Sequence, residues 1–118
     1  MKNEKVFIDD EFGKHIMPID NVYRLEFTKS AAFSSIYNID IYEFDNLLYQ
    51  LRISAKEFTS IIIGINNPGP INFITFFGDV INMEPAENDF SKITINKSIS
   101  IEVNRQKLTD IFTSIIQL

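Results

Sequence analysis

Few side chains in this sequence have the types and spacing that catalysis needs. His15 is the only histidine among the 118 residues, and there is no cysteine. A histidine base needs a nucleophile and an orienting group held close to it. The acids at positions 9 to 11 precede it in a segment without clear periodicity, and no Gly-x-Ser-x-Gly turn offers a serine nucleophile. We therefore expect the protein not to be an enzyme.

Metal and cofactor sites have little support either. One histidine and no cysteine leave carboxylates as the main metal ligands, and these do not follow the spacing of a calcium-binding loop. Asp40, Glu43 and Asp45 are close in sequence, but acids at the start of a helix are explained by the positive end of its dipole. The segment from Asn67 to Pro70 lacks the Gly-Lys-Ser/Thr ending of a phosphate-binding loop. We expect no metal and no cofactor.

The distribution of acids is the main functional signal. The formal net charge is -5, which disfavours direct binding to nucleic acid and favours a basic protein partner. Residues 39–51 hold three acids and no base, residues 79–89 hold four acids and no base, and nearby tyrosines offer aromatic anchors. The competing interpretation is that the acids only keep the chain soluble. The candidate partner-binding residues are Asp40, Tyr42, Glu43, Asp45, Tyr49, Asp79, Glu84, Glu87 and Asp89.

Two segments have the apolar spacing of an amphipathic helix. Phe44, Leu47, Leu48 and Leu51 lie at i, i+3, i+4 and i+7, which predicts a helix from Glu43 to Ile53. The second helix is predicted from Asn104, an N-cap residue, to the C-terminus. Its apolar face consists of Leu108, Ile111, Phe112, Ile115 and Ile116.

Alternating or β-branched segments predict strands. Asn21 to Thr28 alternates, a short strand follows at positions 39–42, and Phe58 to Ile65 is rich in β-branched residues. The last of these is expected to form a hairpin with Ile71 to Phe77 across a Pro/Gly turn. Positions 78–89 are expected to form an exposed acidic loop, because Pro85 prevents a regular strand in its middle. A further hairpin is predicted at positions 92–96 and 98–103, with Asn96 and Lys97 as its turn.

These elements predict one α+β domain over residues 1–118. The expected architecture is a single-layer, mostly antiparallel sheet of five to six strands with two amphipathic helices packed on one face. The chain shows no internal repeat in its sequence.

Composition favours a cytoplasmic protein. The longest uninterrupted apolar run, Ile61 to Ile65, is far shorter than the roughly 20 residues of a transmembrane helix. The N-terminal segment becomes acidic at Asp9 after three apolar residues, which does not fit a secretory signal. The absence of cysteine fits a reducing compartment. We expect no membrane association.

A short, acidic domain without a catalytic motif, rich in Ile, Asn, Lys and Phe, ends in the strand Ser98 to Val103 and a terminal helix. In these features the chain resembles the small immunity proteins of bacterial polymorphic toxin and contact-dependent growth inhibition systems. The resemblance implies a protein that binds and neutralises a cognate toxin domain, expected to be a basic nuclease, by covering its active site or substrate surface with an acidic face. It implies no catalytic residues.

Two other function classes remain open from the sequence. The first is a non-enzymatic structural or regulatory adaptor that self-associates through a sheet edge or the C-terminal helix. The second is a small hydrolase, which requires a deep pocket with converging polar groups.

Overall fold

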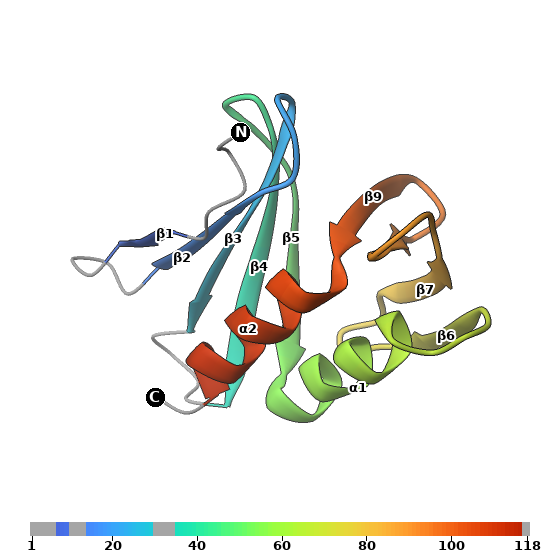
Figure 1. The fold of residues 1–118 in the computed structure, drawn as a ribbon. Coiled ribbons are helices and arrows are strands. Elements are labelled where there is room, and N and C mark those ends of the chain that lie inside the picture. The colour runs from blue at the N-terminus through green and yellow to red at the C-terminus, as the bar shows by residue number, and fades with distance from the viewer. Residues whose placement is uncertain (1–6, 10–13, 30–34, 117–118) are drawn as a thin grey trace. The chain divides into compact units, whose positions relative to one another are not determined.

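The structure is a computed structural model that describes residues 7–9, 14–29 and 35–116. The chain divides into two compact units, unit 1 (residues 1–55) and unit 2 (residues 56–118). Figure 1 shows their elements along the chain. Unit 1 contains β1 (Phe7–Asp9), β2 (Lys14–Pro18), β3 (Tyr23–Lys29), β4 (Ile36–Glu43) and β5 (Asn46–Ser54). Next come α1 (Ala55–Ile65), β6 (Ile71–Ile74), β7 (Val80–Pro85), β8 (Phe90–Ile95), β9 (Ile99–Asn104) and α2 (Arg105–Ile116).

The strands of unit 1 form one antiparallel sheet in sequence order, from β1 to β5. Successive side chains of a strand point to opposite faces, so each strand contributes to an apolar face and a polar face. The polar face places Arg24 opposite Tyr42, and Glu26 opposite Asp40. The buried hydrophobic side chains of the apolar face are Met17, Leu25, Phe27, Tyr37, Ile39, Ile41, Leu51 and Ile53, and the buried His15 lies on the same face.

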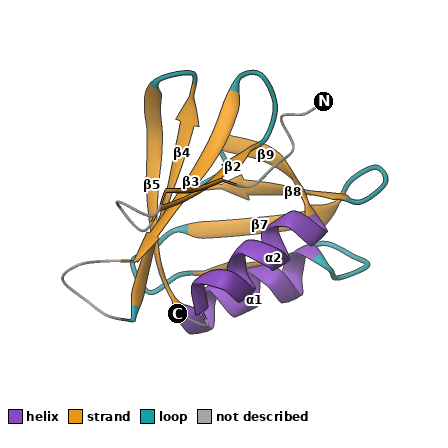
Figure 2. Cartoon of the chain, turned by 60° about the vertical axis from the view of Figure 1, so that its left-hand side comes forward, coloured by secondary structure: helices purple, strands orange, loops and turns teal. Residues whose placement is uncertain are grey.

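The strands of unit 2 form a second antiparallel sheet in the order β6-β7-β8-β9. Its buried face consists of Ile81, Met83, Ile93, Ile95, Ile101 and Val103. Helix α1 packs against this face, since Gly64 lies against Met83 and the Ser91 hydroxyl donates a 2.6 Å hydrogen bond to the Ile65 carbonyl. The two helices lie side by side (Figure 2), and the rings of Phe58 and Phe112 meet edge to face with centroids 5.1 Å apart.

Several predicted elements are confirmed. The strand predicted from Asn21 to Thr28 corresponds to β3, and the predicted second hairpin corresponds to β8 and β9. Its turn residues Asn96 and Lys97 have φ angles of 53° and 60°, a left-handed geometry that suits a tight hairpin. At the start of α2 the Asn104 side-chain oxygen accepts a 3.0 Å hydrogen bond from the Lys107 backbone amide, as an N-cap does.

The helix predicted from Glu43 to Ile53 is wrong, because this segment forms the β4–β5 hairpin. The same segment also has the alternation of a strand, since Leu47, Tyr49, Leu51 and Ile53 fall at every second position. Both periods therefore fit the segment. Pairing with β4 supplies the backbone hydrogen bonds of a strand, and this pairing is not visible in a local pattern.

The strand predicted from Phe58 to Ile65 is also wrong, because these residues belong to α1. Phe58, Ile61 and Ile65 lie at i, i+3 and i+7 and are 0%, 3% and 1% exposed, which is the buried stripe of a helix. Burial of this stripe outweighs the modest helix propensity of isoleucine. The predicted hairpin with residues 71–77 is therefore absent, and β6 pairs with β7 instead.

The acidic loop predicted at positions 78–89 is replaced in part by β7. Ile81 and Met83 are buried at alternate positions of this strand. Pro85 is its last residue, a place where the missing backbone amide is tolerated. The α+β class is confirmed, whereas the single sheet of five to six strands is corrected, for the residues that the structure describes, to one sheet of five strands and one of four.

Candidate protein-binding surface

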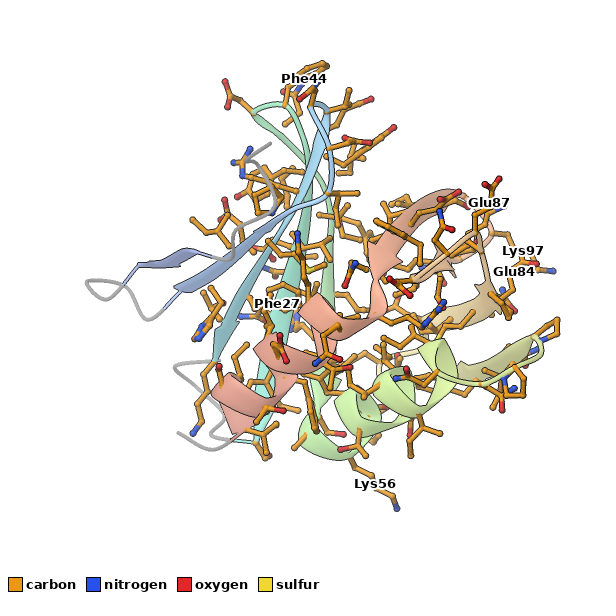
Figure 3. All side chains as sticks on the ribbon, in the orientation of Figure 1. Phe27, Phe44, Lys56, Glu84, Glu87 and Lys97 are labelled. Carbon is orange, nitrogen blue, oxygen red and sulfur yellow. The ribbon has the colours of Figure 1, made fainter. Side chains whose placement is uncertain are left out.

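The end of the β4–β5 hairpin exposes apolar side chains between acidic ones. We call Glu43, Phe44, Asp45, Leu47 and Leu48 the tip surface. Phe44 is 60% exposed, Leu47 is 50% exposed and Leu48 is 39% exposed. Figure 3 shows Phe44 at the end of the hairpin. Single exposed apolar residues are common, but a cluster edged by polar groups is typical of an interaction site.

The backbone at Phe44 is held in place by contacts from β3 and the turn before it. The Phe44 amide donates a 2.7 Å hydrogen bond to the Val22 carbonyl, and Arg24 Nη1 donates one to the Phe44 carbonyl. The φ angle of Phe44 is 54°, a left-handed conformation that bulky residues rarely adopt. Because both backbone groups are bonded, the backbone of this exposed residue is already ordered.

Arg24 holds the tip surface from the polar face of the sheet. Its Nε lies 2.8 Å from Glu26 Oε2, and its guanidinium carbon lies 4.2 Å from the centroid of the Tyr42 ring. Glu26 balances the charge of Arg24, and the Arg24 guanidinium covers one face of the Tyr42 ring. Arg24 therefore supports the hairpin, and the half-buried Glu43 and the exposed Asp45 at the end of the hairpin supply its negative charge.

A hollow of about 400 Å³ lies beside the tip surface. The Asp20 carboxylate lines it and accepts hydrogen bonds from the backbone amides of Val22 and Tyr23, both 2.8 Å long. Asp45 contributes a second carboxylate, and Phe44 and Tyr23 contribute aromatic rings. Arg24 also lines the hollow, and its charge is already balanced by Glu26. The remaining carboxylates beside aromatic rings are suited to a Lys or Arg side chain, through charge and cation-π attraction.

The predicted partner-binding residues of unit 1 are split by the fold. Glu43 and Asp45 belong to the tip surface, and Asp40 and Tyr42 follow it along the polar face of β4. Tyr49 pairs with Ile41 and therefore points to the opposite, apolar face.

Phe44, Leu47 and Leu48 were not predicted to lie on this surface, because their spacing assigned them to the face of a helix. A turn signal was present in the sequence, since Asp45 and Asn46 are residues that favour turns. Together with the alternation from Leu47 onward, this signal indicates a hairpin.

The predicted residues of unit 2 occupy three different environments. Asp79 is 7% exposed and accepts a 2.9 Å hydrogen bond from the Asn96 side chain, so it stabilises the turns around β7. Glu84 is exposed on the outer face of β7, opposite Lys92. Glu87 and Asp89 are exposed between β7 and β8.

A second hollow, of about 300 Å³, lies in unit 2 beside Asp89 and the start of α2. Arg105 lines it, but its guanidinium already donates hydrogen bonds to the carbonyls of Asn88 and Phe90. Asp89 accepts a bond from the Arg105 backbone amide through its own carbonyl. The contacts around this hollow therefore hold the β7–β8 turn against α2.

His15, the only histidine, lies on β2 opposite Phe27 and is 4% exposed. Among residues 7–9, 14–29 and 35–116, no group of three His, Asp or Glu side chains is placed to hold a metal ion. In the same described part of the chain, neither helix has the length and apolar character needed to span a membrane.

Comparisons of the chain with protein-family models, curated proteins and solved structures give no match.

Proposed function

We propose that this chain is a protein-binding inhibitor of the immunity-protein kind, which uses its tip surface to bind and neutralise a cognate bacterial toxin domain. The observation that carries the proposal is the exposed Phe44 on a hydrogen-bonded backbone, next to Leu47 and Leu48 and flanked by Glu43 and Asp45. Binding hot spots combine an aromatic or aliphatic centre with a charged rim in this way.

The charges of the tip surface favour a basic partner. Glu43 and Asp45 lie in a chain with a net charge of -5, so the protein attracts a basic domain and steers its approach. Nuclease toxins carry basic surfaces because they bind phosphates, and an inhibitor that covers such a surface excludes the nucleic acid. The hollow between Asp20 and Asp45 then receives a Lys or Arg side chain of the toxin.

The first test asks whether the chain protects cells. If a large secreted effector is encoded directly upstream of this gene, its C-terminal domain is the toxin domain to use. Co-expression is expected to restore growth and to yield a one-to-one complex on co-purification. Failure of both rescue and co-purification would reject the immunity function.

The second test locates the interface on the molecule. Phe44→Ala is expected to weaken toxin binding on the order of 30-fold, the loss typical of a hot-spot side chain. Phe76→Ala is the matched control, because Phe76 is 86% exposed and belongs to unit 2. Isothermal titration calorimetry should give the control an affinity close to that of the unchanged protein. Equal affinities for both variants would remove the tip surface from the interface.

A further inference from the structure

A second exposed apolar surface lies in unit 2, at the β6 edge of its sheet. We call it the neutral edge, and it consists of Ile63, Ile71, Ile74, Phe76 and Phe77. Phe76 is 86% exposed and Ile74 is 69% exposed, the two highest values among the large exposed apolar residues of the described chain. Within the described residues β6 pairs with β7 on one side only, so its other side has backbone groups available for a further strand.

The neutral edge is held in place by α1. The Ile71 side chain lies against Gly64 near the end of α1, and the Phe76 amide donates a hydrogen bond to Glu57 Oε2 in its first turn. The segment from Ile71 to Phe76 therefore runs antiparallel to α1. Ile63 in α1 is 62% exposed. The rings of Phe76 and Phe77 meet at 86° with centroids 5.4 Å apart, so the two aromatic side chains support each other.

The neutral edge differs in charge from the rest of the chain. From Phe58 to Gly78 the sequence has no charged residue, and this is its longest uncharged stretch. The outermost strands β5 and β9 carry the exposed charges Arg52 and Glu102. Charged side chains on an edge strand oppose pairing with another chain, and β6 lacks them.

We propose that a second copy of this chain occupies the neutral edge, with β6 of each copy paired antiparallel about a two-fold axis. A basic partner gains little attraction at this surface, because its own residues carry no charge and the adjacent Glu57 carboxylate already accepts the hydrogen bond of the Phe76 amide. Two copies that each carry a net charge of -5 repel each other elsewhere, and the uncharged stretch allows the closest approach at the lowest electrostatic cost. A two-fold axis also lets one short strand satisfy the free backbone groups of its own counterpart.

The proposed pair is centred on Asn72, which places Ile71 opposite Phe73 of the second copy. Ile71 and Phe73 share the face of β6 that adjoins Met83 and Ile81 in β7, so the partly covered inner faces of the two sheets become continuous. Two facing neutral edges bury on the order of 1,000 Å², the lower end for a specific interface. The dimer is accordingly expected to dissociate on dilution.

Sedimentation equilibrium over a wide concentration range tests this dimer. The unchanged chain is expected to pass from monomer to dimer as concentration rises, and Ile74→Lys is expected to stay monomeric. The matched control is Leu47→Lys in the tip surface, since Leu47 is 50% exposed and lies in unit 1. It should dimerise as the unchanged chain does while losing toxin binding. A chain that is monomeric at every concentration would overturn the proposal, and so would an Ile74→Lys variant that dimerises as strongly as the unchanged chain. If Ile74→Lys does not fold, Phe76→Asp takes its place.

Cross-linking tests the geometry of the pair. The chain has no cysteine, so one introduced thiol reports only on contacts between copies. Asn72→Cys places two thiols across an antiparallel pair, where Cα atoms are about 4.5–5.5 Å apart and a disulfide is permitted. Ser100→Cys, exposed on the outermost strand β9, is the control. Oxidation should yield a covalent dimer for Asn72→Cys alone. A covalent dimer for Ser100→Cys instead would place the contact elsewhere and overturn the β6 pairing.

These tests separate the two proposals. If the chain fails to protect cells from the toxin, the immunity function is rejected, but the sedimentation result is unaffected. If the chain is monomeric, the dimer is rejected, but binding of a toxin through Phe44 is not.

Discussion

The segments β5–α1 and β9–α2 have the same order of strand and helix, and they bury the same positions. Leu51 and Ile53 in β5 alternate with exposed or partly exposed residues, as Ile101 and Val103 do in β9. The helices then bury Phe58, Ile61 and Ile65 in α1 and Leu108, Ile111 and Ile115 in α2. The chain thus repeats an order of elements and a pattern of buried positions without a repeat that is visible in its sequence.

The two segments differ in how clearly their local sequences predict a strand followed by a helix. In β9, Ser100 and Glu102 separate the apolar residues, and Asn104 caps the helix that follows. In β5, Leu47 and Leu48 are adjacent, so the strand also fits a helical pattern. Helix α1 contains three consecutive isoleucines, which favour a strand. The two segments therefore bury the same positions, although the local sequence of β5 also fits a helix and that of α1 favours a strand.

The largest effect on stability is expected when the first buried residue of each helix is replaced by alanine. Phe58 and Leu108 are 0% and 2% exposed. Phe58→Ala is expected to lower the free energy of unfolding by about 3–5 kcal/mol and Leu108→Ala by about 2–5 kcal/mol, through lost burial and a residual cavity. Urea denaturation of both variants gives these values. A loss below about 1 kcal/mol for Phe58→Ala would show that α1 is not packed as its counterpart is.

A smaller effect is expected from Gly64→Ala in α1, with Ser114→Ala in α2 as the matched control. A methyl group on Gly64 would lie 2.6 Å from Met83 Sδ, and Met83 is 1% exposed. Overpacking costs about 1–3 kcal/mol, which exceeds the roughly 0.5–1 kcal/mol of helix propensity that alanine adds over glycine. Thermal unfolding should show a lower Tm for Gly64→Ala. Ser114 is exposed, so Ser114→Ala should keep or slightly raise the Tm. A raised Tm for Gly64→Ala would contradict close packing of α1 on β7.

The smallest effect concerns the residue before each helix. Asn104→Ala removes the bond to the Lys107 amide and is expected to cost about 1 kcal/mol, whereas Asn104→Asp keeps a capping oxygen and most of the stability. Ser54 precedes α1 in the same way, and Ser54→Ala is expected to cost a similar amount. Circular dichroism during denaturation measures all three variants. If Ser54→Ala does not lower the stability, the β5–α1 and β9–α2 segments are equivalent only in their buried positions and not in the residue that precedes the helix.

The candidate binding surface followed from the sequence only in part. Glu43 and Asp45 were selected from their charge, and they do flank the exposed end of the hairpin. Their apolar neighbours Phe44, Leu47 and Leu48 were assigned to a helix, although their exposure is what distinguishes the surface. Charge is a property of the residue itself, whereas exposure depends on which segments cover it.

What the sequence determined by itself is the set of elements whose signals are local. The α+β class, the turn at Asn96 and Lys97, and the helix after Asn104 depend on alternation, turn geometry and capping within a few residues. The tertiary structure alone decided that residues 46–54 form a strand and residues 55–65 form a helix. In both cases the local preference is ambiguous or opposed, and the deciding free energy comes from pairing with β4 and from packing on β7, which are contacts between distant parts of the chain.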